Sequence, residues 1–150
     1  MGPGDSDDSI PALQDQLAHA RDDCERADLH DALGIRLARD HRLEEALAEC
    51  NQAVALREAL AGRDPGVLPY LATSLGNQGG HLTALGRYGD AIVAHVRALE
   101  IFQRVGPSEP QSLARMGYNA GRLGVLLFTL KEPSLAARSG RRPRPKASEG

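Results

Sequence analysis

The sequence of 150 residues contains no tryptophan, and aromatic residues make up only 3% of it. A core with so few rings must be built from Ala, Leu, Val and Ile, which favours closely packed helices over a β-sandwich or a β-barrel. The two cysteines, Cys24 and Cys50, are too few to hold a small secreted scaffold together, so we expect a reducing, cytoplasmic location. The longest apolar run, residues 123–130, is far shorter than the roughly 20 residues of a membrane-spanning helix, and we expect no membrane contact.

The net charge of −2 conceals an uneven distribution of charge along the chain. Residues 1–31 contain nine acidic side chains against two arginines, whereas residues 131–150 contain six basic side chains against two acidic ones. The near-neutral total gives no general attraction to nucleic acid, and the basic segment has no aromatic residue to stack on bases. We therefore expect no nucleic-acid partner. We interpret residues 1–9 as a disordered acidic lead and residues 131–150 as a disordered, basic, proline-containing tail.

Between these segments, apolar residues recur at the three- and four-residue spacings of amphipathic helices, and no segment alternates as a strand would. The first helix is expected to begin at Ser9, an N-cap residue followed by Pro11, with an apolar stripe from Leu13 to Cys24. Further stripes follow over residues 29–40, 43–60, 68–85, 88–102 and 113–127. The fold class is therefore predicted to be all-α over residues 10–130.

An internal repeat relates these helices to one another. A shift of 45 residues places Gly34 on Gly79, and a further shift of 42 residues places Gly79 on Gly121. A period of this size, with one helical hairpin in each unit, is typical of an α-solenoid. The residues that mark the repeat are Gly34, Ala46, Ala53, Gly79, Gly86, Tyr88, Ala91, Ala98 and Gly121.

This pattern resembles the tetratricopeptide repeat (TPR) family. That family has a small residue midway along the first helix, a Gly–any–Tyr turn and alanines along the second helix, which are matched here by Gly79, Gly86, Tyr88, Ala91 and Ala98. The unit length is similar to the 42-residue subtype found in kinesin light chains and in bacterial regulatory proteins. The resemblance implies an α-solenoid of antiparallel helical hairpins, with an N-terminal helix and about two and a half TPR units.

In TPR proteins the first helix of each hairpin lines a concave groove that holds a peptide or a partner helix. The resemblance places on this groove Asp28, Asp31, Ile35, Thr73, Asn77, Gly80, Thr83, Arg115, Tyr118, Asn119 and Arg122. Asn77 and Arg115 match the carboxylate clamp of co-chaperone repeats. Asp31 and Ile35 do not match it, and Asn119 stands where that clamp has a cation, which argues against a ligand with C-terminal carboxylates.

The groove is instead expected to be acidic at one end and basic at the other. Asn77 and Asn119 lie one repeat apart between these ends, so their amides are placed to hydrogen-bond to the backbone of an extended peptide at successive points. The alternative is that both amides only face solvent.

No pattern for catalysis or metal binding is present in the sequence. The histidines and cysteines do not have zinc-binding spacings, no GxSxG elbow occurs, and the glycines of residues 76–80 lack the lysine and the preceding strand of a phosphate loop. We therefore expect no enzyme activity, cofactor, metal or small-molecule substrate. The expected function is a protein–protein interaction module. The alternative is a truncated sensor segment of a larger bacterial signalling NTPase or protease, without independent function.

The third unit has a first helix but no predicted second one, since Pro133 and polar residues follow it. Leu123, Leu126 and Leu127 are therefore expected to lack cover. Three explanations stay open: a weak return of residues 135–137 onto this face, a partner protein, or a missing part of a longer repeat array. An open face of this kind predicts self-association through the three leucines.

Overall fold

A computed structural model of the chain describes residues 7–106 and 110–131. Within these residues there are six α-helices and one 3₁₀ turn, and no strand. The elements are α1 (Ile10–Ala18), α2 (Asp23–Arg39), α3 (Leu43–Ala61), η1 (Pro65–Val67), α4 (Leu68–Ala84), α5 (Tyr88–Val105) and α6 (Pro110–Lys131). The prediction of an all-α fold is confirmed.

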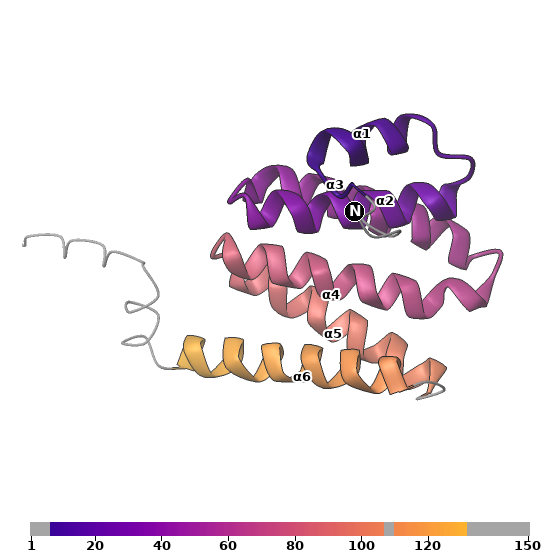
Figure 1. The fold of residues 1–150 in the computed structure, drawn as a ribbon. Coiled ribbons are helices and arrows are strands. Elements are labelled where there is room, and N and C mark those ends of the chain that lie inside the picture. Colours follow the sequence, from indigo (N-terminus) through magenta and orange to yellow (C-terminus); the bar gives the residue numbers. More distant parts are fainter. Residues whose placement is uncertain (1–6, 107–109, 132–150) are drawn as a thin grey trace, which may run out of the picture.

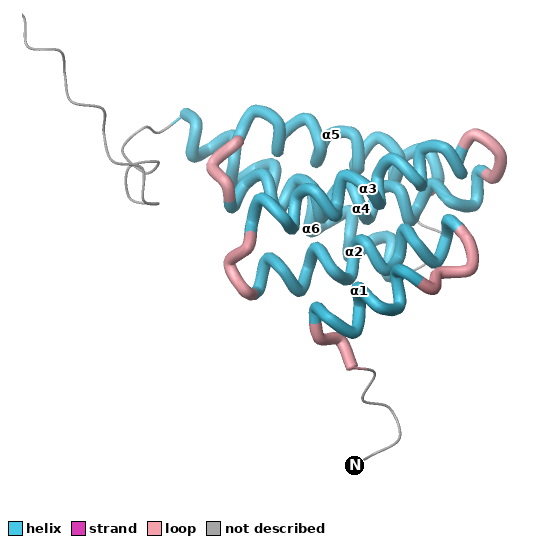
Figure 2. The backbone as a smooth tube through the Cα atoms, turned by 90° about the horizontal axis from the view of Figure 1, so that it is seen from above, coloured by secondary structure: helices cyan, strands magenta, loops and turns pink. Residues whose placement is uncertain are grey.

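The helices form antiparallel hairpins that stack on one another (Figure 1). Helix α2 pairs with α3 and α4 pairs with α5, while α1 lies against α2 at one end of the stack and α6 lies against α4 and α5 at the other. Seen from above, α2 and α4 lie on one side of the stack and α3 and α5 on the other (Figure 2). Because α2 also contacts α4, and α4 contacts α6, the first helices of the three units form one continuous layer.

Several predicted features lie outside the described residues. These are residues 1–6 of the acidic lead and residues 132–150, which include Pro133, residues 135–137 and all but the first residue of the basic tail. Within the described part of the chain, no helix has the length and apolar character needed to cross a lipid bilayer.

The N-terminal helix is shorter than the sequence predicted. Ser9 caps α1 as expected, but the helix ends at Ala18, and α2 then begins after a second cap, Asp22. The carboxylate of Asp22 accepts the N–H of Glu25 at 2.8 Å. Cys24 therefore lies in the first turn of α2, and the prediction of one apolar stripe running as far as Cys24 is wrong, because the stripe crosses a helix boundary.

The core consists of three apolar clusters that follow the stack. The first contains Leu13, Leu33, Leu37 and Ala46, the second contains Leu47, Leu82, Ala91, Ala94 and Leu126, and the third contains Val54, Leu71, Ala72, Leu75, Ala98 and Phe102. Phe102 is the one aromatic side chain among these buried residues. Small and aliphatic side chains therefore carry the packing, as the composition indicated.

The turns inside the two complete hairpins have the same geometry. Gly86, between α4 and α5, has a φ of 74°, and His41, 45 positions earlier between α2 and α3, has a φ of 60°. In both turns the N–H of the next residue, Arg42 or Arg87, donates to a leucine carbonyl five residues back at 2.9 Å, which is the bond of a Schellman motif. A histidine at positive φ is strained where glycine is not. The shared geometry is therefore set by the repeat and not by local sequence preference.

Small residues of the repeat allow the helices of a hairpin to approach closely. A Cβ atom on Gly79 would lie 2.6 Å from the ring of His95, and one on Gly34 would lie 3.1 Å from the carbonyl oxygen of Ala46. Gly121, which the repeat aligns with both glycines, has nothing within 4 Å of the corresponding position. The third unit therefore lacks this crossing in the described residues. The alanines of the repeat, Ala46, Ala53, Ala91 and Ala98, are all fully buried.

Helix α6 departs most from the repeat. Leu113, which the shift aligns with a buried leucine of α4, is 53% exposed, whereas Asn119 and Leu126 are buried. The prediction that Leu126 lacks cover is therefore wrong, since this side chain packs into the second cluster. Leu127 is 52% exposed and Leu123 is half-buried. Compared with α4, α6 is thus turned about its own axis.

Candidate functional site

The exposed sides of α2, α4 and α6 form one surface, hereafter the α2–α4–α6 face, and this surface carries the predicted groove residues. Those that are at least partly exposed are Asp28, Ile35, Thr73, Asn77, Gly80, Thr83, Arg115, Tyr118 and Arg122. Tyr70, in the first turn of α4, is on the same face and 58% exposed. The sequence reasoning missed Tyr70, although its position one turn before Thr73 is a signal that could have identified it.

Two predicted groove residues lie inside the packed helices instead. Asp31 is 8% exposed and Asn119 is 2% exposed. Each is hydrogen-bonded to buried partners within the protein. The structure therefore does not present these two side chains to a ligand.

Asp31 belongs to a buried polar network centred on Arg57 of α3. The guanidinium of Arg57 donates to the carboxylates of Asp28 and Asp31, to the hydroxyl of Ser74 and, at 3.1 Å, to the carbonyl of Tyr70. The Ser74 hydroxyl donates to Asp31 at 2.6 Å. Arg57 is only 6% exposed. Because its partners belong to α2 and α4, the network joins these helices to α3 and links the first hairpin to the second.

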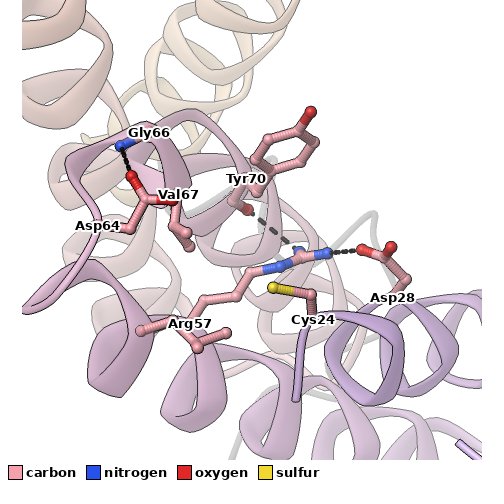
Figure 3. Close-up of a pocket in the computed structure, with 8 residues that line it drawn as sticks. Cys24, Asp28, Arg57, Asp64, Gly66, Val67 and Tyr70 are labelled. Carbon is pink, nitrogen blue, oxygen red and sulfur yellow. Dashed lines mark hydrogen bonds and ion pairs between the residues drawn. The ribbon is translucent and has the colours of Figure 1, made fainter. Parts of the chain in front are cut away.

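A cavity of about 370 Å³ opens beside the network (Figure 3). Its walls are Cys24 and Asp28 of α2, Arg57 and Leu60 of α3, Asp64, Gly66 and Val67 of the connection, and Tyr70 of α4. The ring centroid of Tyr70 lies 5.9 Å from the guanidinium carbon of Arg57, a cation–π distance. The side chain of Asp28 is 69% exposed. Since two carboxylates, Asp28 and Asp64, outnumber the single cation Arg57 among the wall residues, the cavity is acidic.

A second hollow, of about 220 Å³, lies on the other side of Tyr70. It is lined by Gly66, Pro69, Tyr70, Phe102, Gln111, Ser112 and Arg115. The guanidinium of Arg115 donates to the hydroxyl of Thr73, which links α6 to α4. Tyr70 thus lines both an acidic hollow and a hollow that contains a cation.

The middle of the α2–α4–α6 face carries the polar side chain of Asn77 and, nearby, exposed aromatic rings. Asn77 is half-buried, and its amide forms no hydrogen bond to any other described residue. Tyr118 of α6 is 56% exposed, and its hydroxyl lies beside Gly80, 3.8 Å from where a Cβ atom would be. Thr83, by contrast, donates its hydroxyl to the carbonyl of Gly79 at 2.7 Å. Of the two asparagines expected to meet a peptide, only Asn77 is free to do so.

Asn119 is occupied by a buried histidine of α5. The Nδ1 of His95 lies 2.7 Å from the Oδ1 of Asn119, whose amide nitrogen donates to the carbonyl of Arg115 at 2.8 Å. An amide oxygen can only accept, so we assign the proton of His95 to Nδ1. Burial lowers the pKa of His95; the bond to Asn119 opposes this shift, and Arg122 adds to it. Burial likewise lowers the pKa of His81, against the opposing charge of Asp31.

Acid is expected to destabilise the protein through these two histidines. Their pKa values are lower in the folded state than the ordinary 6.5, so the unfolded state binds protons first as the pH falls. The stability that neutral His81 and His95 provide is therefore present above pH 6.5 and is lost below it. We expect a lower urea midpoint at pH 5 than at pH 7.5, and a smaller decrease in the variant His95→Gln. An equal decrease in both proteins would contradict this assignment.

The described residues do not gather metal-binding side chains. No group of three or more His, Cys, Asp and Glu side chains lies close enough together in the described ranges to hold an ion. Cys24 is an exposed free thiol, whereas Cys50 is buried. Burial, with the nearby charge of Asp31, raises the pKa of the Cys50 thiol, so this sulfur stays protonated.

Comparison with known proteins identifies the fold. No protein-family profile and no curated protein matches this sequence. Among solved structures, the chain is similar to the crystal structure of BtubC (BKLC) from P. vanneervenii, a kinesin-light-chain-like protein, with a TM-score of 0.57 and 21% sequence identity. The match covers 93% of this chain and 59% of the BtubC chain. At this identity the likeness concerns the fold alone, and it shows a helical-repeat fold of the TPR and kinesin-light-chain type.

Proposed function

We propose that this protein is a non-catalytic interaction module whose α2–α4–α6 face binds an extended peptide segment of a partner protein. The observation that carries the proposal is the free, half-buried amide of Asn77, between the exposed rings of Tyr70 and Tyr118. An amide can donate to and accept from a peptide backbone, and the two rings provide apolar contact area at little entropic cost. The helical-repeat fold supports this proposal, because such repeats generally mediate protein interactions.

The charges on the face define the chemistry of the peptide. Asp28 faces the acidic cavity on the α2 side, whereas Arg115 and Arg122 belong to α6. A matching segment carries a basic side chain where it passes α2 and an acidic one where it passes α6. Asp31 and Asn119, which are bonded internally, take no part.

The proposal is tested by probing an array of extended peptides that combine one basic and one acidic side chain. We expect the variants Asn77→Ala and Arg115→Ala to bind about tenfold more weakly, because each removes a hydrogen-bonding group of the face. The matched controls are Asn51→Ala on α3 and Arg97→Ala on α5, which lie in the other helix layer and are expected to bind normally. The absence of any binding peptide, or unchanged binding by both Asn77→Ala and Arg115→Ala, overturns the proposal.

A further inference from the structure

Among residues 7–106 and 110–131, nothing covers the outer side of α6, and this side is apolar. Six of the nine large apolar side chains that are exposed in the described residues belong to α6. One of them, Tyr118, is on the α2–α4–α6 face, and the other five are Leu113, Val125, Leu127, Phe128 and Leu130. Monomeric proteins seldom expose so many large apolar side chains on one helix, and such a surface usually marks a site of protein–protein interaction.

Glycines run along the middle of this surface. Five residues follow one another at helical spacings of three and four and are hereafter called the glycine stripe: Leu113, Gly117, Gly121, Gly124 and Phe128. In the part of the chain that the structure describes, no atom beyond the neighbouring backbone of α6 itself lies within 4 Å of a Cβ position on any of the three glycines. Helix α6 contains no acidic side chain. A second helix can therefore approach the α6 backbone closely along this stripe.

We propose that the glycine stripe packs against the glycine stripe of a second copy of the chain, with the two α6 helices antiparallel and a two-fold axis at Gly121. This symmetry places residues at equal distances from Gly121 opposite each other. Phe128 then lies over Ala114 of the other copy, and Val125 lies over Gly117, so that each of these two large side chains meets a small one. A parallel pair in register would instead press the two Phe128 rings together and would place all three glycines, and not Gly121 alone, opposite glycine.

Other occupants fit the surface less well. The opposite end of the stack offers little apolar surface, because α1 contributes none of the large apolar side chains that are exposed in the described residues. Residues 132–150 carry five basic and two acidic side chains, which gives no charge complementarity with α6 and its three cations. In the antiparallel pair, by contrast, Arg115 and Arg122 point to the α4 side, where Arg115 is bonded to Thr73. The net charge of −2 per chain adds little repulsion between copies.

The size of the contact sets the expected affinity. With 22 residues, α6 is about 33 Å long. Two faces of this length and the width of one helix bury on the order of 1,000 Å² in total, at the lower end of specific interfaces. We therefore expect a dimer with a dissociation constant in the micromolar range, which dissociates on dilution.

Sedimentation velocity of the full 150-residue chain over a range of concentrations tests the proposal. We expect the mass to double with rising concentration, and the variant Phe128→Glu to weaken dimerisation at least about tenfold. The matched control is Val93→Glu on α5, because Val93 and Phe128 are both 58% exposed, and this variant is expected to dimerise normally. A chain that stays monomeric at all concentrations, or a dimer that Phe128→Glu leaves intact, overturns the proposal.

Cysteine cross-linking tests the orientation. The exposed Cys24 is first replaced by serine, while the buried Cys50 is kept. On mild oxidation the variant Gly121→Cys is expected to form a disulfide dimer, since the two-fold axis passes through this position. The variant Ala114→Cys is expected not to do so, because its two copies would be about 21 Å apart along the helices. Equal cross-linking of both variants indicates a parallel pair and contradicts the arrangement, as does the absence of cross-linking at position 121.

Discussion

Replacement of Arg57 by alanine is expected to lower the free energy of unfolding by about 3–5 kcal/mol. The substitution leaves the carboxylate of Asp31, which is 8% exposed, without its counter-charge. It also removes the hydrogen bonds by which Arg57 joins α3 to α2 and α4. In a helical repeat, each unit is held only by its neighbours, so a bond between two units affects the whole array. Urea unfolding followed by far-UV circular dichroism measures this loss.

The control for the buried Arg57 is Arg97, an exposed arginine of α5. Arg97 of α5 pairs with Glu58 at 2.6 Å, but the two side chains are 46% and 44% exposed. We expect Arg97→Ala to cost about 1 kcal/mol or less, because water screens the pair. If both variants lose the same stability, the burial of the Arg57 network is not what makes it important.

The repeat suggests how the loss can be repaired. The 45-residue shift places Phe102 at the position of Arg57 and Gly76 at the position of Asp31, and Phe102 packs in an apolar cluster. The second unit thus has an apolar ring at the position of Arg57 and no side chain at the position of Asp31. We expect the double variant Arg57→Met with Asp31→Val to recover most of the stability lost in Arg57→Ala, since no buried charge is then left alone.

The sequence was sufficient to predict the helices and their order in the stack. Helix formation depends on local spacing, and apolar residues three and four positions apart identified all the complete hairpins. The shift of 45 residues also aligned His41 with Gly86, and the two turns have the same backbone geometry. The helices were predictable because each is encoded by the spacing of neighbouring residues, and the shared turn geometry because the repeat aligns His41 with Gly86.

The polar contacts between helices could not be predicted in this way. Periodicity separates apolar from polar positions, but it does not tell which polar side chain lies between two helices and which lies on the surface. Arg57 was therefore not distinguished from the solvated arginines, and Asp31 was placed on the groove. Both side chains are hydrogen-bonded to Ser74, a residue of the next repeat unit, and local periodicity does not reveal this contact.

The orientation of α6 shows the same limitation. Its apolar stripe predicted that Leu113 would be buried, whereas the structure buries Asn119. The physical reason is the fully buried His95, whose Nδ1–H needs an acceptor, and the side chain of Asn119 supplies it. A hydrogen bond between α5 and α6 thus decides which side of α6 faces the core, and the spacing of leucines carries no information about it.

The close contact of α4 and α5 at Gly79 predicts that a larger side chain at this position lowers the stability of the protein. Gly79→Ala should lower the free energy of unfolding by about 1–3 kcal/mol, because the added Cβ would lie 2.6 Å from the His95 ring. This loss opposes the gain of up to about 1 kcal/mol that alanine brings to a helix interior. The ring cannot retreat, since His95 is fully buried and held by Asn119. Chemical unfolding again provides the measurement.

Two further variants separate steric strain from helix propensity. Gly89→Ala in α5, where nothing lies within 4 Å of the new Cβ, is expected to be neutral or to stabilise the protein by up to about 1 kcal/mol. In a His95→Ala background, Gly79→Ala should lose most of its effect, because the methyl group then enters the space that the ring has left. If Gly79→Ala were equally harmful with and without the ring, the strain would lie in the α4 backbone. The close crossing would then not depend on the fit between this glycine and the histidine of the paired helix.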